Sequence, residues 1–463
     1  MSTENLFPYA PGPGIAKFDP ASPLPDHVKP TRRYLANLGL LLLPAQPFPP
    51  MPPKEGTEPG SLQPGQILLG IQGSLGLMDK DVTAFMPPNL TRLHPDKFSD
   101  EFFVERRLNG FNPGKLNKVQ NKPWQYAVRY DCSKYQVEPA GILPKIIEAR
   151  FCLNAQKLNV HSIEFTMNGK PTIQTPGDEE WEQTKRLFRC AEFVLQESQS
   201  HLARTHMNMD QYAMAYYRNV VNNPIKELLE PHLEGLININ KLGASLIIGD
   251  KGFIPEASAL EPASINDLIE EEIRHLTYRN WNPSVQKLPD FVANNYFDPA
   301  AIAMWELLTE YVDGFISHHR TGIEACWNEI QDMSKDLSSH AILKPELGKL
   351  DILGLEDLAQ LCVYVIYISS FFHSWVNNKQ YEDGGDVDYA VIGLWDSQSP
   401  HYDPVQVATR EAKQASLLWT LSNVRYNPIL EAGPGPLKDL IWARRDVISP
   451  GLPVEDIMMS INI

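Results

Sequence analysis

Two pairs of side chains that commonly bind metals stand at helical spacing in the sequence. His201 and His206 lie five positions apart in the run HLARTH, and His373 and Asn377 lie four apart in HSWVN. Neutral imidazole is a common donor to transition metals, and an amide oxygen suits a metal that changes charge. The apolar chain end, SINI, closes on Ile463, and a buried α-carboxylate there would need a counter-charge that a metal can supply. Together these groups predict a site for a redox-active metal.

Both pairs belong to segments that are expected to form buried helices. An apolar stripe at helical spacing runs through residues 181–206, made of Trp181, Phe188, Ala191, Leu195 and Leu202. Residues five apart on a regular α-helix point roughly 140° from each other, so His201 and His206 need a locally widened, π-type turn to reach one metal. His373 and Asn377 share one face of an ordinary helix over 355–378. That helix is apolar on all sides and is therefore expected to be central.

In this combination the chain resembles the lipoxygenase family. The matching landmarks are GFNP at 110–113, a Trp and a Lys before H-x4-H, NNPIKELLEPHLEGLININ at 222–240, H-x3-N followed by Gln380-Tyr381, and the terminal isoleucine. They span roughly residues 104–463. The resemblance implies one non-haem iron per chain, cycling between Fe2+ and Fe3+, with manganese as a rare substitute. The ligands that it carries over are His201, His206, His373, Asn377 and the Ile463 carboxylate.

The resemblance also implies an activity. The expected enzyme is a dioxygenase that inserts molecular oxygen into polyunsaturated fatty acids of the linoleate, linolenate or arachidonate type, giving hydroperoxides. No side chain is expected to act as acid or base, because an iron-bound hydroxide takes up the hydrogen. Two alternatives remain: a hydroperoxide isomerase that forms epoxyalcohols on the same fold, and a metal-dead lipid-binding protein.

The stereochemistry of the product is expected to depend on a small residue after the ININ run. Gly243 occupies the position where the family tends to have alanine for S products and glycine for R products, so the resemblance implies R-configured hydroperoxides. An in-helix glycine costs about 1 kcal/mol relative to alanine and calls for a reason. The expected walls of the substrate tunnel are Ile247, Ile254 and Leu421, although core packing is the simpler interpretation of Ile247 alone.

Two polar residues are expected beside the ligands. Gln380 matches a family residue that hydrogen-bonds near the asparagine ligand. Glu197 stands where many relatives have glutamine, and a carboxylate there is expected to alter the hydrogen bonding of Asn377. After Gly384-Gly385, where plant relatives carry an arginine, this chain has DVDYA. Entry of the substrate tail first, or use of an esterified lipid, is therefore an open alternative.

Composition limits the partners and the location. The 463 residues carry a formal net charge of −16, which argues against nucleic acid and allows at most weak membrane association. Five scattered cysteines, with no C-x-x-C, indicate reduced thiols. The first residues show no basic and apolar leader, so a cytoplasmic protein is expected. The expected partners are a polyunsaturated fatty acid or its ester, and molecular oxygen.

The predicted architecture is mainly α, a single lipoxygenase-type catalytic domain with long central helices carrying the iron ligands and small β elements in the N-terminal third. Thirteen of the 39 prolines fall within residues 1–53, so residues 1–60 are expected to form an extended arm, with a short helix at 31–42, and residues 61–463 the catalytic domain. This organisation resembles a minimal, bacterial-type member without the N-terminal β-sandwich. Strands are expected at Ala127–Cys132 and in a hairpin over Ser162–Thr175 that turns at Asn168-Gly169. Helices are expected at 175–221, 265–279, 298–318, 322–337, 355–378 and 404–424.

Overall fold

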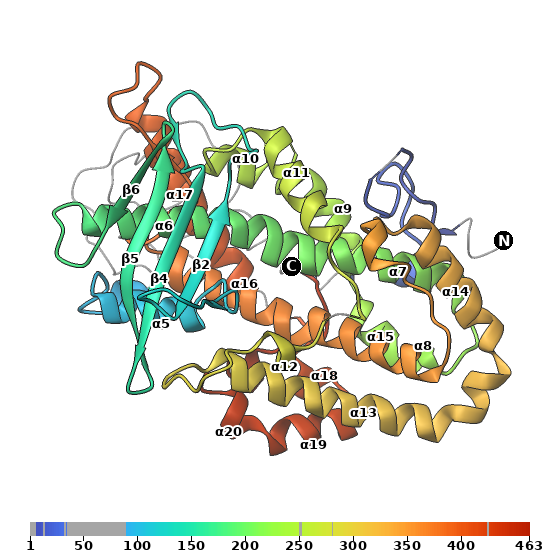
Figure 1. Cartoon of the computed structure of the whole chain (residues 1–463). Coiled ribbons are helices and arrows are strands. Elements are labelled where there is room, and N and C mark those ends of the chain that lie inside the picture. The colour runs from blue at the N-terminus through green and yellow to red at the C-terminus, as the bar shows by residue number, and fades with distance from the viewer. Residues whose placement is uncertain are drawn as a thin grey trace, which may run out of the picture.

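The protein was analysed as a computed structural model, which describes residues 6–12, 14–31, 34, 89–249, 252–279, 281–423 and 426–463. Two long helical runs cross the middle of the molecule, and the other elements pack around them (Figure 1). The first run is formed by α6 (Trp181–Leu195), a π-helical segment (Gln196–Met207) and α7 (Asn208–Asn219). The second is formed by α15 (Leu355–Tyr367), a π-helical segment (Ile368–Phe372) and α16 (His373–Gly384).

Among the described residues, five strands form one antiparallel sheet in the order β1-β2-β4-β5-β6. It packs against α5 and α6 at one end of the molecule (Figure 1). The strands are β1 (Asn117–Lys118), β2 (Tyr126–Asp131), β4 (Ile146–Asn154), β5 (Lys157–Met167) and β6 (Lys170–Gln174), while β3 (Gly141–Ile142) pairs with β7 (Leu394–Trp395). Asn168 and Gly169 both have positive φ, 50° and 74°, between β5 and β6. These angles are those of the predicted type I′ hairpin turn.

The remaining helices surround the two central runs. Those before residue 300 are α4 (Leu90–Leu93), α5 (Asp100–Asn109), α8 (Ile225–Leu233), α9 (Leu236–Leu246), α10 (Phe253–Ala257), α11 (Pro262–Ile273), α12 (Pro283–Gln286) and α13 (Phe297–Ala325). Those that follow are α14 (Trp327–His340), α17 (Pro404–Asn423), α18 (Ile429–Ala432), α19 (Gly435–Ala443) and α20 (Arg445–Ile448). Short 3₁₀ turns occupy Asp26–Val28, Pro345–Leu347 and Val454–Asp456.

The second central run is buried nearly all round. Every residue from Leu361 to Asn377 is buried. Within the described chain, Leu355–Gly384 is the only helical run long and apolar enough to cross a bilayer, and 72% of its apolar window is buried inside the protein. The predicted central helix is thus confirmed, and it extends further at its C-terminal end, to Gly384. A Cβ on Gly384 would lie 2.5 Å from the ring of Phe193, so the close contact between the two central runs requires glycine there.

The described part of the N-terminal arm lies against α7. The ring of Phe7 stacks on Tyr217 with centroids 5.1 Å apart, and Arg218 donates a hydrogen bond to the carbonyl of Phe7 at 2.7 Å. Residues 35–88 lie outside the described residues. The predicted division at residue 60 therefore stays a prediction, and so does the short helix at 31–42, of which only residues 31 and 34 are described.

Two elements were not expected from the sequence. Helix α5 spans ten residues and is capped by Ser99, whose side chain accepts a hydrogen bond from the amide of Phe102. Strand β4 was not predicted, although Ile147, Ala149 and Phe151 alternate with polar residues and are fully buried. The mainly helical fold with a small sheet in the N-terminal third is confirmed.

All five cysteines are free thiols. Cys132, Cys190 and Cys362 are buried, whereas Cys152 and Cys326 are partly accessible. Burial raises the pKa of the Cys132 and Cys190 thiols to about 12, and it raises the pKa of the Cys362 thiol as well. These three thiols therefore stay protonated at neutral pH.

Candidate metal centre

The first pair of histidines lies in the π-helical segment Gln196–Met207, as the sequence spacing predicts. A π-helix pairs residues five apart along its backbone, so His201 and His206 come to lie on the same side of the helix, one turn apart. Both side chains are buried, with 2% and 6% of their surface exposed, and their ring centroids are 5.1 Å apart. The widened turn thus brings together two imidazoles that a regular helix would separate.

The third imidazole comes from the second central run. His373 begins α16, immediately after the π-helical segment Ile368–Phe372, and is 1% exposed. Its ring centroid lies 5.5 Å from that of His201 and 5.1 Å from that of His206. One ring nitrogen from each histidine lies within 4.8 Å of those of the other two. Three buried nitrogen donors at this spacing could hold a metal ion.

Hydrogen bonds fix the orientation of the first two rings. His206 Nδ1 lies 2.8 Å from Oδ1 of Asn240, and His201 Nδ1 lies 3.2 Å from Oε2 of Glu197. Both partners accept hydrogen bonds, so this network assigns the proton to Nδ1 and leaves a lone pair on Nε2. Neither Nε2 has a hydrogen-bond partner among the described residues. Buried polar atoms without partners are costly, and a bound metal would satisfy them.

Burial opposes protonation of two of the imidazoles. The pKa of His206 is lowered to about 3, mainly by burial and in addition by the nearby His201 ring, while the hydrogen bond with Asn240 acts in the opposite direction. Burial likewise lowers the pKa of His373 well below its ordinary value, aided by His206 and His201 and opposed by the backbone of Ile463. Neutral imidazole is the form that binds metal, so the residues present fit a transition-metal ion.

Asn377 lies one turn after His373 on α16 and is 3% exposed. Its Nδ2 donates to the carbonyl of Leu421 at 2.9 Å, and its Oδ1 accepts from Nε2 of Gln380 at 3.2 Å. Gln380 is fully buried. The amide of Asn377 is therefore oriented from both ends, by Gln380 on its own helix and by α17.

The chain end lies in the interior, where Figure 1 marks C among the helices. Ile463 is 4% exposed, and its backbone lies beside His373. Ser374 Oγ accepts a hydrogen bond from the amide of Met458 at 2.9 Å, and the Tyr34 hydroxyl donates to the carbonyl of Asn462. The last residues are thus attached both to the helix that carries His373 and to the N-terminal arm.

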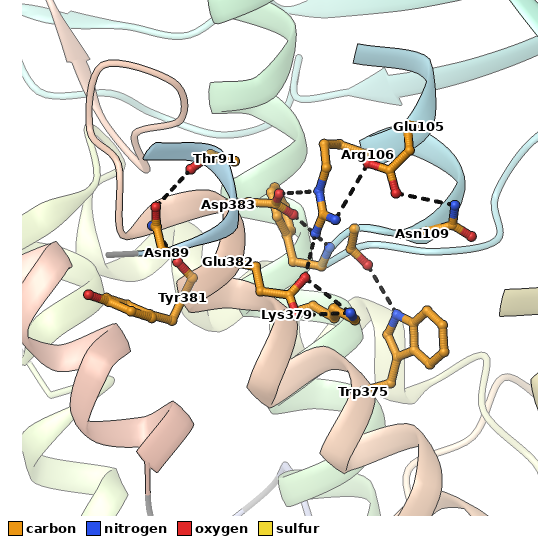
Figure 2. A network of polar contacts seen from close by, with 12 residues as sticks. Asn89, Thr91, Glu105, Arg106, Asn109, Trp375, Lys379, Tyr381, Glu382 and Asp383 are labelled. Atoms are coloured by element: carbon orange, nitrogen blue, oxygen red, sulfur yellow. Dashed lines mark hydrogen bonds and ion pairs between the residues drawn. The ribbon is translucent and has the colours of Figure 1, made fainter. Parts of the chain in front are cut away.

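A buried polar network attaches α16 to α5 (Figure 2). Arg106 Nε donates to Oδ1 of Asp383 at 2.5 Å, and the other carboxylate oxygen accepts from the amide of Phe111 at 3.0 Å. Trp375, two residues after His373, donates through Nε1 to the carbonyl of Gly110 at 3.1 Å. A Cβ on Gly110 would lie 2.4 Å from the Arg106 carbonyl oxygen, so glycine is required. The GFNP landmark therefore positions the second metal-bearing helix.

The residues expected near the substrate lie on several elements. Gly243 is on α9, one turn after Asn240, and an added Cβ would meet only Cγ1 of Ile247 at 3.8 Å. Ile247 is partly exposed, Ile254 is fully buried, and the amide of Ile254 donates to the carbonyl of Ile247 at 3.0 Å. Leu421 contacts the site through its carbonyl, which accepts the Asn377 hydrogen bond. A methyl group at position 243 therefore fits without a clash.

Glu197 has a different partner from the one expected. Its carboxylate contacts Nδ1 of His201, whereas Asn377 is bonded to Gln380, Asn378 and Leu421 among the described residues. The reason is local, because Glu197 lies four positions before His201 on the same helix and reaches it along that face. Any effect of the Glu197 carboxylate on the site therefore acts through the ring of His201.

Sequence reasoning did not identify Asn240 or Gly110 as supports of the site. Asn240 is 5% exposed, and it holds His206 at both the ring and the backbone, since its Nδ2 donates to the His206 carbonyl at 2.8 Å. The available signal was the alternation of asparagine with apolar residues in the run LININ, which ends at the buried Asn240. His232 is also buried and contacts the Met459 carbonyl through Nδ1 at 2.7 Å.

Comparison with known proteins adds independent evidence. Residues 164–296 match a family model described as Lipoxygenase. The chain is 37% identical over 378 residues to linolenate 9R-lipoxygenase of Nostoc sp. (strain PCC 7120). The alignment covers 80% of this chain and 47% of that protein. It is 24% identical over 341 residues to the arachidonate 12-lipoxygenase, 12R-type, of Rattus norvegicus. That alignment covers 61% of this chain and 47% of the rat protein.

The fold is similar to that in a crystal structure of a 9R-lipoxygenase from Cyanothece PCC8801. The TM-score is 0.81 at 24% identity, and the match covers 99% of this chain and 76% of the other. The chain spans about half the length of the curated relatives that it matches. Family model, sequence similarity, fold and the histidine cluster agree, and the chain belongs to the lipoxygenase family.

Proposed function

We propose that this protein is a non-haem iron dioxygenase that converts polyunsaturated fatty acids, free or esterified, to hydroperoxides of R configuration. The observation that carries the proposal is the buried cluster of imidazoles at His201, His206 and His373, in which one ring nitrogen of each lies within 4.8 Å of those of the other two. Two relatives named above are R-type lipoxygenases, which supports the stereochemical part.

The proposed ligands are the three histidines, the Asn377 amide oxygen and the Ile463 carboxylate. Nitrogen-rich donors with one carboxylate and one weak amide suit an ion that alternates between Fe2+ and Fe3+. Bound iron would supply the one-electron chemistry that breaks a C–H bond between two cis double bonds and lets oxygen add to the carbon radical. No acidic or basic side chain is needed for that chemistry.

The protein's own residues would orient the ligands and exclude water. Asn240 and Glu197 hold two of the rings by Nδ1, and Gln380 restrains the amide of Asn377. Burial favours the neutral form of His206 and His373, because it lowers the pKa of both, so no proton must be displaced from these two rings before a metal binds. The proposed tunnel walls are Ile247, Ile254 and Leu421. We propose the cytoplasm as the location, with which the free thiols are compatible.

The experiment is oxygen uptake with linoleate and with arachidonate by protein whose iron content has been measured. About one iron per chain is expected, with one oxygen consumed per hydroperoxide formed. Consumption of added hydroperoxide with little oxygen uptake would instead show the isomerase, and protein without bound metal would contradict both.

Product chirality tests the role proposed for Gly243. Chiral chromatography is expected to give mainly R products from the wild type and a larger S fraction from Gly243→Ala, because the added methyl narrows the space available to oxygen. The variant should fold normally, since the methyl meets only Ile247 Cγ1 at 3.8 Å. An unchanged R to S ratio would remove Gly243 from the stereochemical proposal.

A further inference from the structure

A cleft of about 360 Å³ runs from the protein surface to the two segments that carry the histidines. Val285 stands at its rim and is 81% exposed, whereas Tyr367 and Phe372 in its floor are 1% and 3% exposed. Two residues that line the cleft are close to the histidines in the sequence. Phe372 immediately precedes His373, and Arg204 lies between positions 201 and 206 of the chain. The cleft thus shares its walls with both metal-bearing helices.

The charge in this cleft is opposite to that of the whole protein. Among the described residues that line it, the cations are Lys115, Lys118, Arg204 and Lys287, and the only acid is Asp298. The chain as a whole has 57 acidic and 41 basic residues. A local excess of cations in an acidic protein attracts anions specifically to this place.

Some of these charges already have partners. Arg204 is paired with Glu272 at 2.6 Å, and Lys118 at the rim is paired with Asp290 at 2.7 Å. The carboxylate of Asp298 accepts from the amide of Leu288 at 3.0 Å and from Asn295 Nδ2 at 2.7 Å. The carboxylate of Asp298 is therefore hydrogen-bonded to the loop that precedes α13.

Lys115 has no such partner. Its ammonium group makes no hydrogen bond or ion pair of its own with another residue that the structure describes, although the side chain is partly buried. The pKa of Lys115 is lowered to about 7, mainly by burial and in addition by the nearby Arg204, while Glu272 acts in the opposite direction. Its backbone has φ 62°, directly after Gly114 at 75°, a conformation that is strained for lysine. An anion bound in the cleft would supply the missing counter-charge.

The floor of the cleft is apolar. It is built mainly from aromatic side chains, which are Trp281, Phe297, Tyr367 and Phe372, together with Leu116 and Ala301. The Trp281 and Phe372 rings meet edge to face with centroids 5.5 Å apart. A small polar anion would leave this surface unused, whereas a hydrocarbon chain attached to the anion would cover it.

We propose that this cleft binds a single-chain lipid with a carboxylate head, in which Lys115 pairs with the carboxylate and the aromatic floor holds the adjoining part of the chain. The choice of a fatty acid among anionic amphiphiles rests on the proposed function, but binding in the cleft requires no metal. The carboxylate could belong to the substrate itself during turnover or to a second fatty acid that binds beside it.

Titration calorimetry with oleate tests the proposal directly. Oleate has one double bond and so lacks the reactive CH2, and oleyl alcohol is a matched ligand without charge. Wild-type protein is expected to bind oleate about tenfold more tightly than the alcohol, as one charge-assisted contact provides. Lys115→Met should lose that preference and leave the affinity for the alcohol unchanged.

Two further variants separate charge from structure. Lys118→Met removes a rim cation that already has a partner, and it should keep the wild-type affinity for oleate. Lys115→Arg keeps the charge and should restore the preference that Lys115→Met loses. Equal affinities of wild type and Lys115→Met for oleate, or equal affinities of the wild type for the two ligands, would overturn the proposal.

Kinetics with linoleate and methyl linoleate identify the source of the carboxylate. A raised KM for linoleate alone in Lys115→Met, with kcat unchanged, shows that the head of the substrate occupies the cleft. If added oleate changes the rate, and excess linoleate does not abolish that change, the cleft binds a second fatty acid beside the substrate. Binding of oleate by a protein without oxygenase activity would refute the proposed function and leave this inference standing.

Discussion

His201 and His206 are each held at Nδ1 by a side chain, which leaves Nε2 of each as the atom available to a metal. His373 has no side-chain partner at either nitrogen among the described residues, and the backbone of Ile463 lies beside its ring, so its position depends on its own helix and on the chain end. The three donors are thus supported unequally. Substitution of Glu197 should show how much a hydrogen-bond acceptor at Nδ1 contributes to metal binding, because its carboxylate is the partner of the His201 ring.

Replacing Glu197 tests this contact. Glu197→Ala removes the acceptor at His201 Nδ1 and is expected to weaken metal binding about 10- to 100-fold, the usual effect of losing such a partner. Glu197→Gln keeps an acceptor and should lose less. Metal affinity can be measured by competition with a coloured chelator, with Glu324→Ala on the exposed surface of α13 as the control. An unchanged affinity in Glu197→Ala would show that the ring is held by packing alone.

Asp210 gives the protein a defined pH dependence. Burial raises its pKa from 3.8 to about 7, and its Oδ1 has no partner in the described chain. The folded protein then holds a proton that the unfolded chain has released, so this group costs stability progressively as pH rises from about 4 to 7. Asp210→Asn should therefore raise the urea midpoint at pH 8 and change it little at pH 4.5. A gain of equal size at both pH values would contradict this assignment.

The two long helical runs carry the site, and the first is widened over the segment that holds His201 and His206. The π turn at 196–207 was predictable, because two histidines five apart cannot otherwise face one metal. The hairpin at Asn168-Gly169 was predictable from turn chemistry. Helix α5 was not, because its Arg106 is buried by pairing with Asp383, 277 positions away, and no local pattern shows that.

The ion pair between these two helices should contribute strongly to stability. Asp383→Ala leaves the buried Arg106 guanidinium with Glu382 at 3.0 Å and Glu105 at 3.6 Å as its remaining partners, and it is expected to cost about 2 kcal/mol of the free energy of unfolding, less than the loss of a sole partner. In the matched control, Glu324→Ala breaks the exposed pair with Arg320 and should cost about 0.5 kcal/mol or less. Urea denaturation measures both losses. Similar costs for the two variants would mean that the buried pair does not hold α16 in place.

At the scale of the whole molecule, segments distant in sequence meet at one place. The N-terminal arm contacts Asn462, the C-terminal residues contact α16, and the GFNP loop supports the same helix. The sequence resemblance predicted a ligand set but not these supports, because Asn240, Gly110 and Tyr34 act through contacts that only the folded chain creates. The paths of the substrate and of oxygen depend on such long-range packing too.

Because the site joins both central runs, metal removal should loosen the molecule as a whole. A metal present at about 1,000 times its dissociation constant stabilises the folded state by about 4 kcal/mol. Chelation under anaerobic conditions is expected to lower Tm, and added Fe2+ should restore it. His373→Ala is the control, since its Tm should respond to neither treatment. A wild-type Tm that is insensitive to chelation would show that the protein alone holds the imidazoles together.

The placement of the thiols bears on how long an enzyme with the proposed activity can work. A hydroperoxide product would oxidise the protein that releases it, and thiolates are the groups that peroxides attack first. Cys132, Cys190 and Cys362 are shielded by burial and kept protonated. Oxidative wear should therefore begin at Cys152 and Cys326, and peptide mass spectrometry after prolonged turnover should find sulfinic acid there before it reaches the interior.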